Sequence, residues 1–131
     1  EIEAVTGVQT CALPIYCTVF VADLAAVDVE TLGPALEAHA LFPARTNVHF
    51  VQVVDRGHIR LRIWERGGGV PLGSGSCCCG AVVNGVRRGL LDDSVEVHCD
   101  GGTVTVQWDG QGGVVLTGRV EPIMHGIAMR L

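Results

Sequence analysis

The sequence has 131 residues, of which 48% are apolar, and a formal net charge of −5. This length suffices for one domain with a modest core and leaves little room for a second. Its basic residues form no run longer than the pair Arg87-Arg88, which excludes an electrostatic surface for nucleic acid or for an acidic membrane. The longest apolar runs fall far short of the roughly 20 residues that a membrane-spanning helix needs.

The six cysteines are the second compositional feature. Three are consecutive, at Cys77, Cys78 and Cys79, a spacing that neither disulfide scaffolds nor zinc sites normally use. We therefore expect reduced thiols in a cytoplasmic protein, with the triplet buried in a helix. A zinc site built from the triplet, His98 and Cys99 is the alternative, and the absence of paired Cys-x-x-Cys knuckles weighs against it.

Residues 1–15 are expected to be a non-native leader. Val5 to Ile15 resembles, without a break, the translation of a common sequencing-library adapter, and such segments are set aside before a fold is considered. The adapter's last base would supply the first base of codon 16. Tyr16 can therefore stand where the native residue is His, Asn or Asp. The alternative is a genuine amino-terminal segment with a free Cys11.

The first elements after this leader are predicted to be a strand and a helix. Residues 17–22 form a run rich in β-branched and aromatic side chains. Residues 28–39 carry apolar side chains at helical spacing behind Asp28, a residue type that caps helices. Pro34 is tolerable near a first turn and leaves the helix boundary uncertain.

Residues 47–54 and 58–65 flank the polar turn Asp55-Arg56-Gly57, which predicts a β-hairpin. Alternate residues of the second strand share an apolar face: Ile59, Leu61 and Ile63. Glu65 falls on the same face, directly before three glycines. Desolvation can raise the pKa of a carboxyl group in such a place, which suggests a site. An exposed, frayed strand end fits the pattern equally well.

Residues 77–88 are small and apolar and end in Arg87, Arg88 and Gly89, which predicts a helix with a cationic last turn. A helix that is apolar nearly all round is buried on several sides, here by a curved sheet. Further strands are expected at 95–99, 103–108, 114–117 and 123–129, with turns at 100–102 and 109–113. The predicted fold class is α+β, an antiparallel sheet curved around one central helix.

Three landmarks, in this order, resemble the diaminopimelate epimerase family. They are Thr46-Asn47-Val48 before a strand, Trp64-Glu65-Arg66-Gly67 at a strand end, and Gly69-x-x-x-x-Ser74-Gly75-Ser76 before the helix. The likeness continues through Arg87 to Leu91 and covers about residues 16–131, roughly the second half of the family's usual length. Any one landmark is weak, whereas their ordered combination is specific. The resemblance implies a carboxy-terminal domain that is incomplete at its start.

The same resemblance implies a cofactor-independent isomerase that interconverts LL- and meso-diaminopimelate for lysine and peptidoglycan precursor synthesis. In enzymes of that family, two pseudo-symmetric domains face each other. Each domain contributes one cysteine, at a helix N-terminus, and the two cysteines lie on opposite faces of the substrate's α-carbon. One cysteine removes the proton and the other returns it, so neither pyridoxal nor a metal ion is needed. The expected partners are the substrate and a missing amino-terminal domain, and the resemblance allows a homodimer.

Several residues take site roles by this resemblance. The substrate-binding set comprises Asn47, Glu65, Arg66, Gly75 and Ser76. Backbone N–H groups at the helix N-terminus would hold the amino acid's carboxylate, and Glu65 would also tune a cysteine's acidity. Tyr16 stands at the family's histidine, and Ser74 stands at its second catalytic cysteine. Taken singly, these residues also fit ordinary roles, such as a strand start, a solvated charge and a helix cap.

The departures from the family pattern cluster in one motif. Cys77 stands at a usual glycine, Val70 and Pro71 replace the usual Glu-Thr, and Ser74 replaces the cysteine. A thiol has a reference pKa of about 8.5, whereas a serine hydroxyl is far less acidic and needs a partner base. We therefore expect the chain as written to be inactive. The alternatives are a proline racemase-like or hydroxyproline epimerase-like isomerase, disfavoured by Asn47 with Glu65-Arg66, and a degenerate non-catalytic domain.

Overall fold

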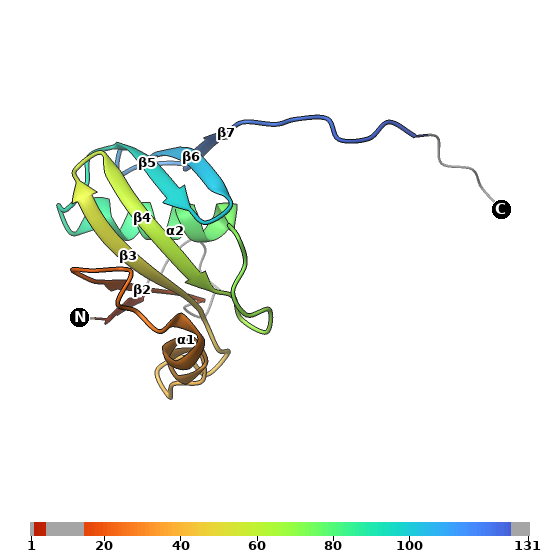
Figure 1. The fold of residues 1–131 in the computed structure, drawn as a ribbon. Helices are drawn as coiled ribbons and strands as arrows, with labels where there is room; N and C mark the ends of the chain where they lie inside the picture. Colours follow the sequence, from red (N-terminus) through yellow and green to blue (C-terminus); the bar gives the residue numbers. More distant parts are fainter. Residues whose placement is uncertain (1, 5–14, 127–131) are drawn as a thin grey trace.

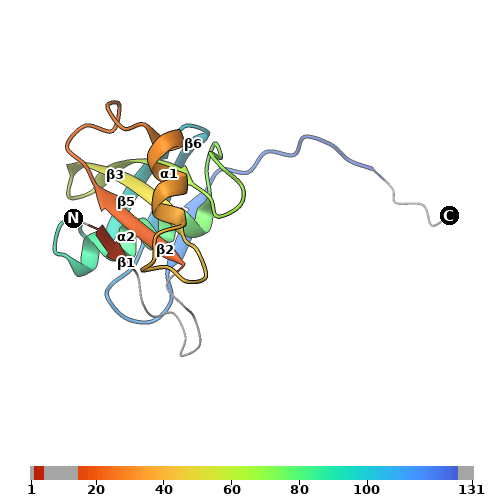
Figure 2. The same cartoon turned by 90° about the horizontal axis from the view of Figure 1, so that it is seen from below.

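A computed structural model describes residues 2–4 and 15–126 of the chain. In this part the fold is a mixed sheet of seven strands, in chain order across the sheet, with one helix on each face (Figures 1 and 2). The strands are β1 (Ile2–Ala4), β2 (Tyr16–Phe20), β3 (Asn47–Asp55), β4 (His58–Trp64), β5 (Ser94–Cys99), β6 (Gly102–Gln107) and β7 (Val115–Gly118). The helices are α1 (Val29–Glu37) and α2 (Gly75–Arg87).

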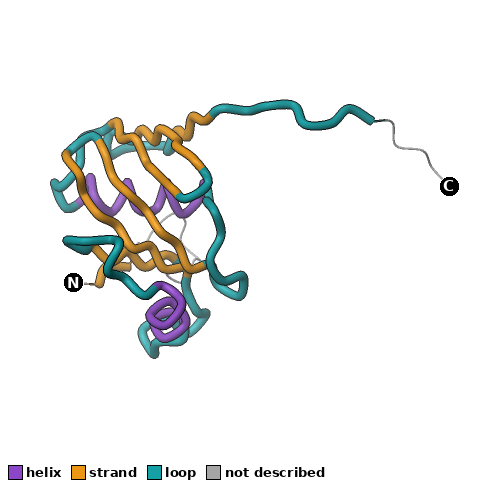
Figure 3. The backbone as a smooth tube through the Cα atoms, viewed as in Figure 1, coloured by secondary structure: helices purple, strands orange, loops and turns teal. Residues whose placement is uncertain are grey.

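The sheet is not antiparallel throughout, which corrects the sequence prediction. β2 pairs with β3 in parallel, and β4 pairs with β5 in parallel, whereas the other neighbours are antiparallel. The reason is that each parallel pair is joined by a crossover that contains a helix, α1 in the first and α2 in the second. The α+β class and the sheet curved around a central helix are confirmed, and Figure 3 shows α2 crossing behind the strands.

The main core lies between α2 and one face of the sheet. The buried side chains of this core include Ile59, Leu61 and Ile63 from β4, Val95 and Val97 from β5, and Ala81 and Val82 from α2. The small residues of α2 allow close packing, since a Cβ atom at Gly85 would lie 2.3 Å from Leu91 Cδ1. The central helix therefore packs close to its neighbours by having little side chain of its own.

The second core lies between α1 and the opposite face of the sheet, and its buried side chains include Val29, Val48 and Phe50. Asp28 caps α1 as predicted, because its carboxylate accepts a hydrogen bond of 3.1 Å from the Thr31 N–H. Gly33 faces Trp64 so closely that a Cβ atom there would lie 2.4 Å from the indole ring.

The predicted hairpin and the turns are confirmed. The Asp55 carboxylate accepts a 2.8 Å hydrogen bond from the Gly57 N–H in the turn between β3 and β4. Gly102 and Gly110 have φ angles of 142° and 89°, which glycine adopts without the penalty that other residues incur.

The prediction of a closing strand at 123–129 is wrong for residues 123–126, which form no strand and run away from the body of the protein (Figure 1). Ile123 and Met124 are 96% and 89% exposed, so no neighbouring strand pairs with them. Residues 127–129 lie outside the described residues.

Of the expected leader, only Ile2–Ala4 and Ile15 belong to the described residues. Ile2–Ala4 form β1, which pairs with β2. Neither α1 nor α2, the helices of the described part, is long and apolar enough to cross a membrane.

Candidate active site

Helix α2 begins with an N-terminus that its own N-cap residue leaves open. Ser74 occupies the N-cap position in an extended conformation, with φ of −150° and ψ of 116°, but its side chain accepts no hydrogen bond from the first turn. Its hydroxyl group lies close enough to the Cys77 thiol to lower the pKa of that thiol, against the larger effect of burial. The ordinary helix-cap role of Ser74 is therefore not realised, and the first N–H groups of α2 keep their capacity to bind an anion.

Ser74 and Gly75 line a cavity of about 680 Å³ whose walls also include Cys78, Cys99 and Leu116. The cavity is tight at the helix start, since a Cβ atom at Gly75 would lie 3.1 Å from Leu116 Cδ2. The other predicted site residues do not line this cavity: Tyr16, Asn47, Glu65, Arg66 and Ser76.

Asn47 and Arg66 are brought into direct contact. The Asn47 side-chain oxygen accepts a 2.9 Å hydrogen bond from the Arg66 N–H, and its amide nitrogen donates to the Ile15 carbonyl at 3.0 Å. The Arg66 guanidinium donates to the Ala44 carbonyl at 3.0 Å. Asn47 therefore ties the turn after β4 to the start of β3, with both ends of its amide group engaged.

Glu65 ends β4 at a tight turn closed by a 2.7 Å hydrogen bond from its N–H to the Gly69 carbonyl. Gly67 and Gly69 have φ angles of 73° and 82°, which this turn requires. The Glu65 carboxylate lies within electrostatic range of the Cys77 thiol in the first turn of α2: burial is the main cause of that thiol's raised pKa, and the negative charge of Glu65 adds to it. The turn thus places Glu65 within electrostatic range of the first turn of α2.

Tyr16 lies beside Asn47 and His49 of the neighbouring strand β3. It is the register partner of Asn47 in the parallel pair of β2 and β3, and its ring centroid is 5.5 Å from that of His49. A Cβ atom at Gly80 would lie 3.4 Å from Tyr16 Cγ, so the second turn of α2 packs directly on this ring.

The thiols of the triplet are poor bases at neutral pH. Burial raises the pKa of Cys77 to about 11, and the hydrogen bond from Ser74 only partly opposes this effect. Burial also raises the pKa of Cys79. Cys77 and Cys78 are buried as predicted, at 1% and 2% exposure, whereas Cys79 is only partly buried. Within residues 2–4 and 15–126, no three His, Cys, Asp or Glu side chains are placed to hold a metal ion.

Sequence reasoning missed Glu37, which holds the turn that carries Glu65 and Arg66. This buried carboxylate accepts hydrogen bonds of 2.6 Å from the Trp64 indole and 3.0 Å from the Gly67 N–H, and pairs with Arg45 at 3.1 Å. Helical geometry supplied a signal, because Val29, Gly33 and Glu37 share the buried face of α1.

Sequence reasoning also missed a buried polar network beside Tyr16. The Thr18 hydroxyl accepts a 2.8 Å hydrogen bond from the Asn84 amide and lies 3.2 Å from His49 Nδ1. Burial lowers the pKa of His49 to about 3, so the ring is neutral. Its position two residues before Val51, on the face of β3 that packs on α2, was the available signal.

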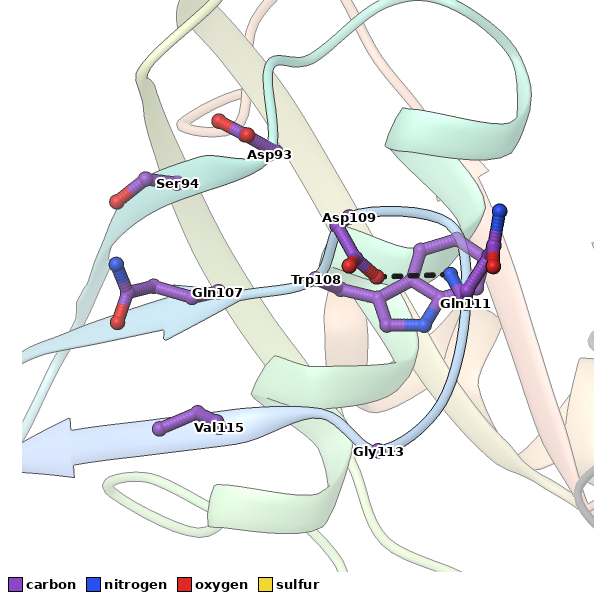
Figure 4. Close-up of a pocket in the computed structure, with 8 residues that line it drawn as sticks. All are labelled: Asp93, Ser94, Gln107, Trp108, Asp109, Gln111, Gly113 and Val115. Atoms are coloured by element: carbon purple, nitrogen blue, oxygen red, sulfur yellow. Dashed lines mark hydrogen bonds between the residues drawn. The ribbon is translucent and has the colours of Figure 1, made fainter.

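A second hollow lies at the turn between β6 and β7 (Figure 4). Its walls include Asp93, Trp108 and Asp109, and the Asp109 carboxylate accepts a 2.9 Å hydrogen bond from the Gln111 N–H. None of the predicted site residues lines it, so it does not belong to the candidate site.

The sequence is similar to curated diaminopimelate epimerases. It is 50% identical over 105 residues to that of Albidiferax ferrireducens, 47% identical over 105 residues to that of Chromobacterium violaceum and 45% identical over 107 residues to that of Rhodospirillum centenum. The matches cover 79%, 79% and 82% of this chain, but 36%, 38% and 37% of the relatives. The chain thus spans well under half the length of the relatives it matches.

Two solved structures, both described as phenazine biosynthesis proteins of the PhzF family, share the fold. The Bacillus anthracis structure has a TM-score of 0.52 at 20% identity, over 75% of this chain and 32% of that chain. The Enterococcus faecalis structure has a TM-score of 0.59 at 6% identity, over 82% of this chain and 38% of that chain. At these identities the likeness shows the fold alone.

The family model described as diaminopimelate epimerase matches residues 15–123, which include both cores and the start of α2. This match, together with the curated relatives, settles the family. The chain belongs to the diaminopimelate epimerase family.

Proposed function

We propose that residues 16–131 form the carboxy-terminal domain of a cofactor-independent diaminopimelate epimerase and that residues 1–15 are a non-native leader. The reaction is the interconversion of LL- and meso-diaminopimelate. The observation that carries the proposal is the open N-terminus of α2 at Ser74 and Gly75, with Glu65 in electrostatic range of its first turn, in a chain of this family.

In the proposed complex, the N–H groups of Gly75 and Ser76 hold the substrate's α-carboxylate. An uncapped helix start supports this role, because its donors are unsatisfied and its dipole favours negative charge. Asn47 and Arg66 bind other polar groups of the substrate, and their mutual hydrogen bond supports a common position. Tyr16, at the family's histidine position, is the remaining proposed site residue of this domain.

The side chain at position 74 is the proposed acid or base for one face of the α-carbon, and the missing amino-terminal domain supplies the other. A cysteine at a helix N-terminus has a lowered pKa and can act as a thiolate. Serine lacks that acidity, and the neighbouring Cys77, with a pKa of about 11, does not replace the missing thiolate. We therefore propose that the chain as written does not catalyse the reaction.

A chimera tests this function. The carboxy-terminal region of the Albidiferax ferrireducens relative is replaced by residues 16–126 of this chain, with either Ser74 or Ser74→Cys. We expect the Ser74→Cys chimera to introduce solvent deuterium at the α-carbon of LL-diaminopimelate. The Ser74 chimera should be slower by roughly a thousandfold, since acid–base groups contribute on that scale.

Ser76→Cys is the matched control, because it adds a thiol to the same helix start at a position with no proposed acid–base role. It should not restore exchange. A folded Ser74→Cys chimera that leaves LL-diaminopimelate unlabelled would contradict the proposal. Turnover of proline in place of diaminopimelate would favour the proline racemase-like alternative.

The serine at position 74 is the observation that favours the alternative of a degenerate, non-catalytic domain. Calorimetry of the chain with diaminopimelate, beside a circular dichroism spectrum of a folded protein, addresses it. Heat of binding supports a substrate site, and a folded chain without heat favours the alternative.

We also propose a cytoplasmic location. The free thiols of Cys17, Cys77, Cys78, Cys79 and Cys99 support it, because oxidising compartments favour disulfides. A homodimer of the whole enzyme stays a prediction that analytical ultracentrifugation would check.

A further inference from the structure

Two thiols from distant parts of the sequence meet beside the cavity at the start of α2. Cys78 Sγ lies 3.6 Å from Cys99 Sγ, within reach of an S–H···S hydrogen bond. Cys78 belongs to the first turns of α2, and Cys99 is the last residue of β5. The contact therefore joins the central helix to the sheet.

The backbone around this pair holds the two thiols in place. The Cys78 N–H donates to the Ser74 carbonyl at 2.9 Å, within the regular hydrogen bonding of α2. On the other side, the Gly101 N–H donates to the Leu72 carbonyl at 2.6 Å, which ties the turn after β5 to the segment before α2. Gly73 also lies next to this pair, since a Cβ atom there would lie 3.8 Å from Cys99 Cβ, an ordinary van der Waals contact.

The two thiols differ in access to solvent. Cys78 is 2% exposed, whereas Cys99 is partly exposed, and both line the cavity. The hydrogen bond from Cys78 lowers the pKa of Cys99, although burial opposes it, and the same contact raises the pKa of Cys78. Cys99 is thus the accessible thiol that ionises first, with a second thiol behind it.

We propose that Cys78 and Cys99 form a redox-sensitive pair, a modification site that small-molecule disulfides such as oxidised glutathione convert into an intramolecular disulfide. A disulfide needs the sulfurs at about 2.05 Å, so they must approach by roughly 1.5 Å. The cavity beside them gives the side chains room for this adjustment.

The exchange proceeds in two steps. The Cys99 thiolate attacks one sulfur of the small disulfide, an S–S bond forms to Cys99, and one small thiolate leaves. Cys78 then gives up its proton to solvent and attacks the Cys99 sulfur, which expels the second small thiolate. The two protein thiols are oxidised to one disulfide, and the small disulfide is reduced to two thiols.

This inference goes beyond the proposed enzyme function and does not depend on it. Its consequence is local, because the new bond would fix the first turns of α2 to the end of β5 on the wall that Ser74 and Gly75 also line. Oxidation would therefore change the wall of the cavity that Ser74 and Gly75 line, without modifying Ser74 or Gly75 themselves.

The test uses the full chain with Cys11→Ser, which removes the one cysteine outside the described residues. The protein is incubated with oxidised glutathione, free thiols are alkylated, and the products are mapped by mass spectrometry without reduction. We expect the count of free thiols to fall by two per chain and the only cross-link to join Cys78 to Cys99. Added dithiothreitol should restore both thiols.

Three variants separate this pair from its neighbours. Cys78→Ser should keep glutathione on Cys99, because the resolving thiol is gone. Cys99→Ser should form no cross-link and should react with glutathione at least about tenfold more slowly. Cys77→Ser is the matched control, since Cys77 is as buried as Cys78 in the same helix, and it should keep the cross-link.

The proposal is overturned if the folded Cys11→Ser protein keeps all its thiols. It is equally overturned if glutathione stays on Cys99 in the presence of Cys78, or if the cross-link uses Cys17, Cys77 or Cys79. Loss of the cross-link in Cys77→Ser as well as in Cys78→Ser would assign the effect to disturbed packing and would also overturn it.

Discussion

The two helices of the described fold begin in different ways. At α1 the Asp28 carboxylate accepts a hydrogen bond from the Thr31 N–H, which satisfies one of the free donors of the first turn. At α2 the residue in the same position, Ser74, caps no donor of the first turn with its side chain. The first helix is closed by its own chain, whereas the second is left open.

The last residue of α1 also uses its polar side chain to hold the scaffold together. Glu37, its last residue, is buried and binds Trp64, Gly67 and Arg45. These contacts hold the turn that carries Glu65, whose charge acts on Cys77 in the first turn of α2. The difference teaches that α1 uses its polar groups to fix the scaffold, while α2 begins without a side-chain cap.

The largest expected effect tests the scaffold half of this comparison. Glu37→Ala removes the acceptor for the Trp64 indole and the Gly67 N–H and leaves Arg45 unpaired. We expect the free energy of unfolding to fall by about 3 kcal/mol, as is typical when one partner of a buried charged network is lost. Urea unfolding followed by Trp fluorescence measures this change.

Glu30→Ala is the control for that prediction, because Glu30 is an exposed residue of the same helix. Its effect should be within about 0.5 kcal/mol of zero. Equal losses in the two variants would show that Glu37 is an ordinary surface carboxylate and would remove the contrast between the helices.

The next effect concerns the buried network beneath α2. His49 is neutral in the folded protein, with a pKa of about 3, whereas in the unfolded chain its pKa is near the ordinary value of 6.5. Between these values the unfolded state binds one more proton, so stability falls as pH drops from about 6.5 towards 3. The expected slope is about 1 kcal/mol per pH unit, measured by urea unfolding across that range.

His49→Gln should flatten this slope, since glutamine does not titrate. His58 gives a control of opposite sign, because its pKa is raised chiefly by the hydrogen bond to Asp55. Its contribution is present below its unfolded pKa and is lost as pH rises through the folded value. An unchanged slope in His49→Gln would mean that the buried histidine is not responsible for the acid sensitivity.

The smallest effects compare the two helix starts directly. Asp28→Ala removes a cap that is present and should lower the melting temperature by several degrees. Ser74→Ala removes a side chain that caps nothing and should change the melting temperature hardly at all. Differential scanning calorimetry of the two variants in one buffer measures both. A larger loss for Ser74→Ala would show that the start of α2 is closed after all.

Local patterns in the sequence determined much of the fold. The Asp28 cap, the turn at Asp55 to Gly57 and the small-residue helix before Gly89 could all be predicted, because each depends on residues close together in the chain. The family followed from landmarks in their order, from Asn47 to Ser76. The roles of the individual site residues stay predictions, since only their placement is described.

Only the tertiary structure decided which distant residues meet. The parallel pairing of β2 with β3 and of β4 with β5 depends on helical crossovers, which the alternation of side chains does not reveal. The hydrogen bond from Trp64 to Glu37 joins residues 27 positions apart. The contact of Cys78 with Cys99 joins residues 21 positions apart. Periodicity tells which face a side chain occupies, but the partner across that face is chosen by how the whole chain packs.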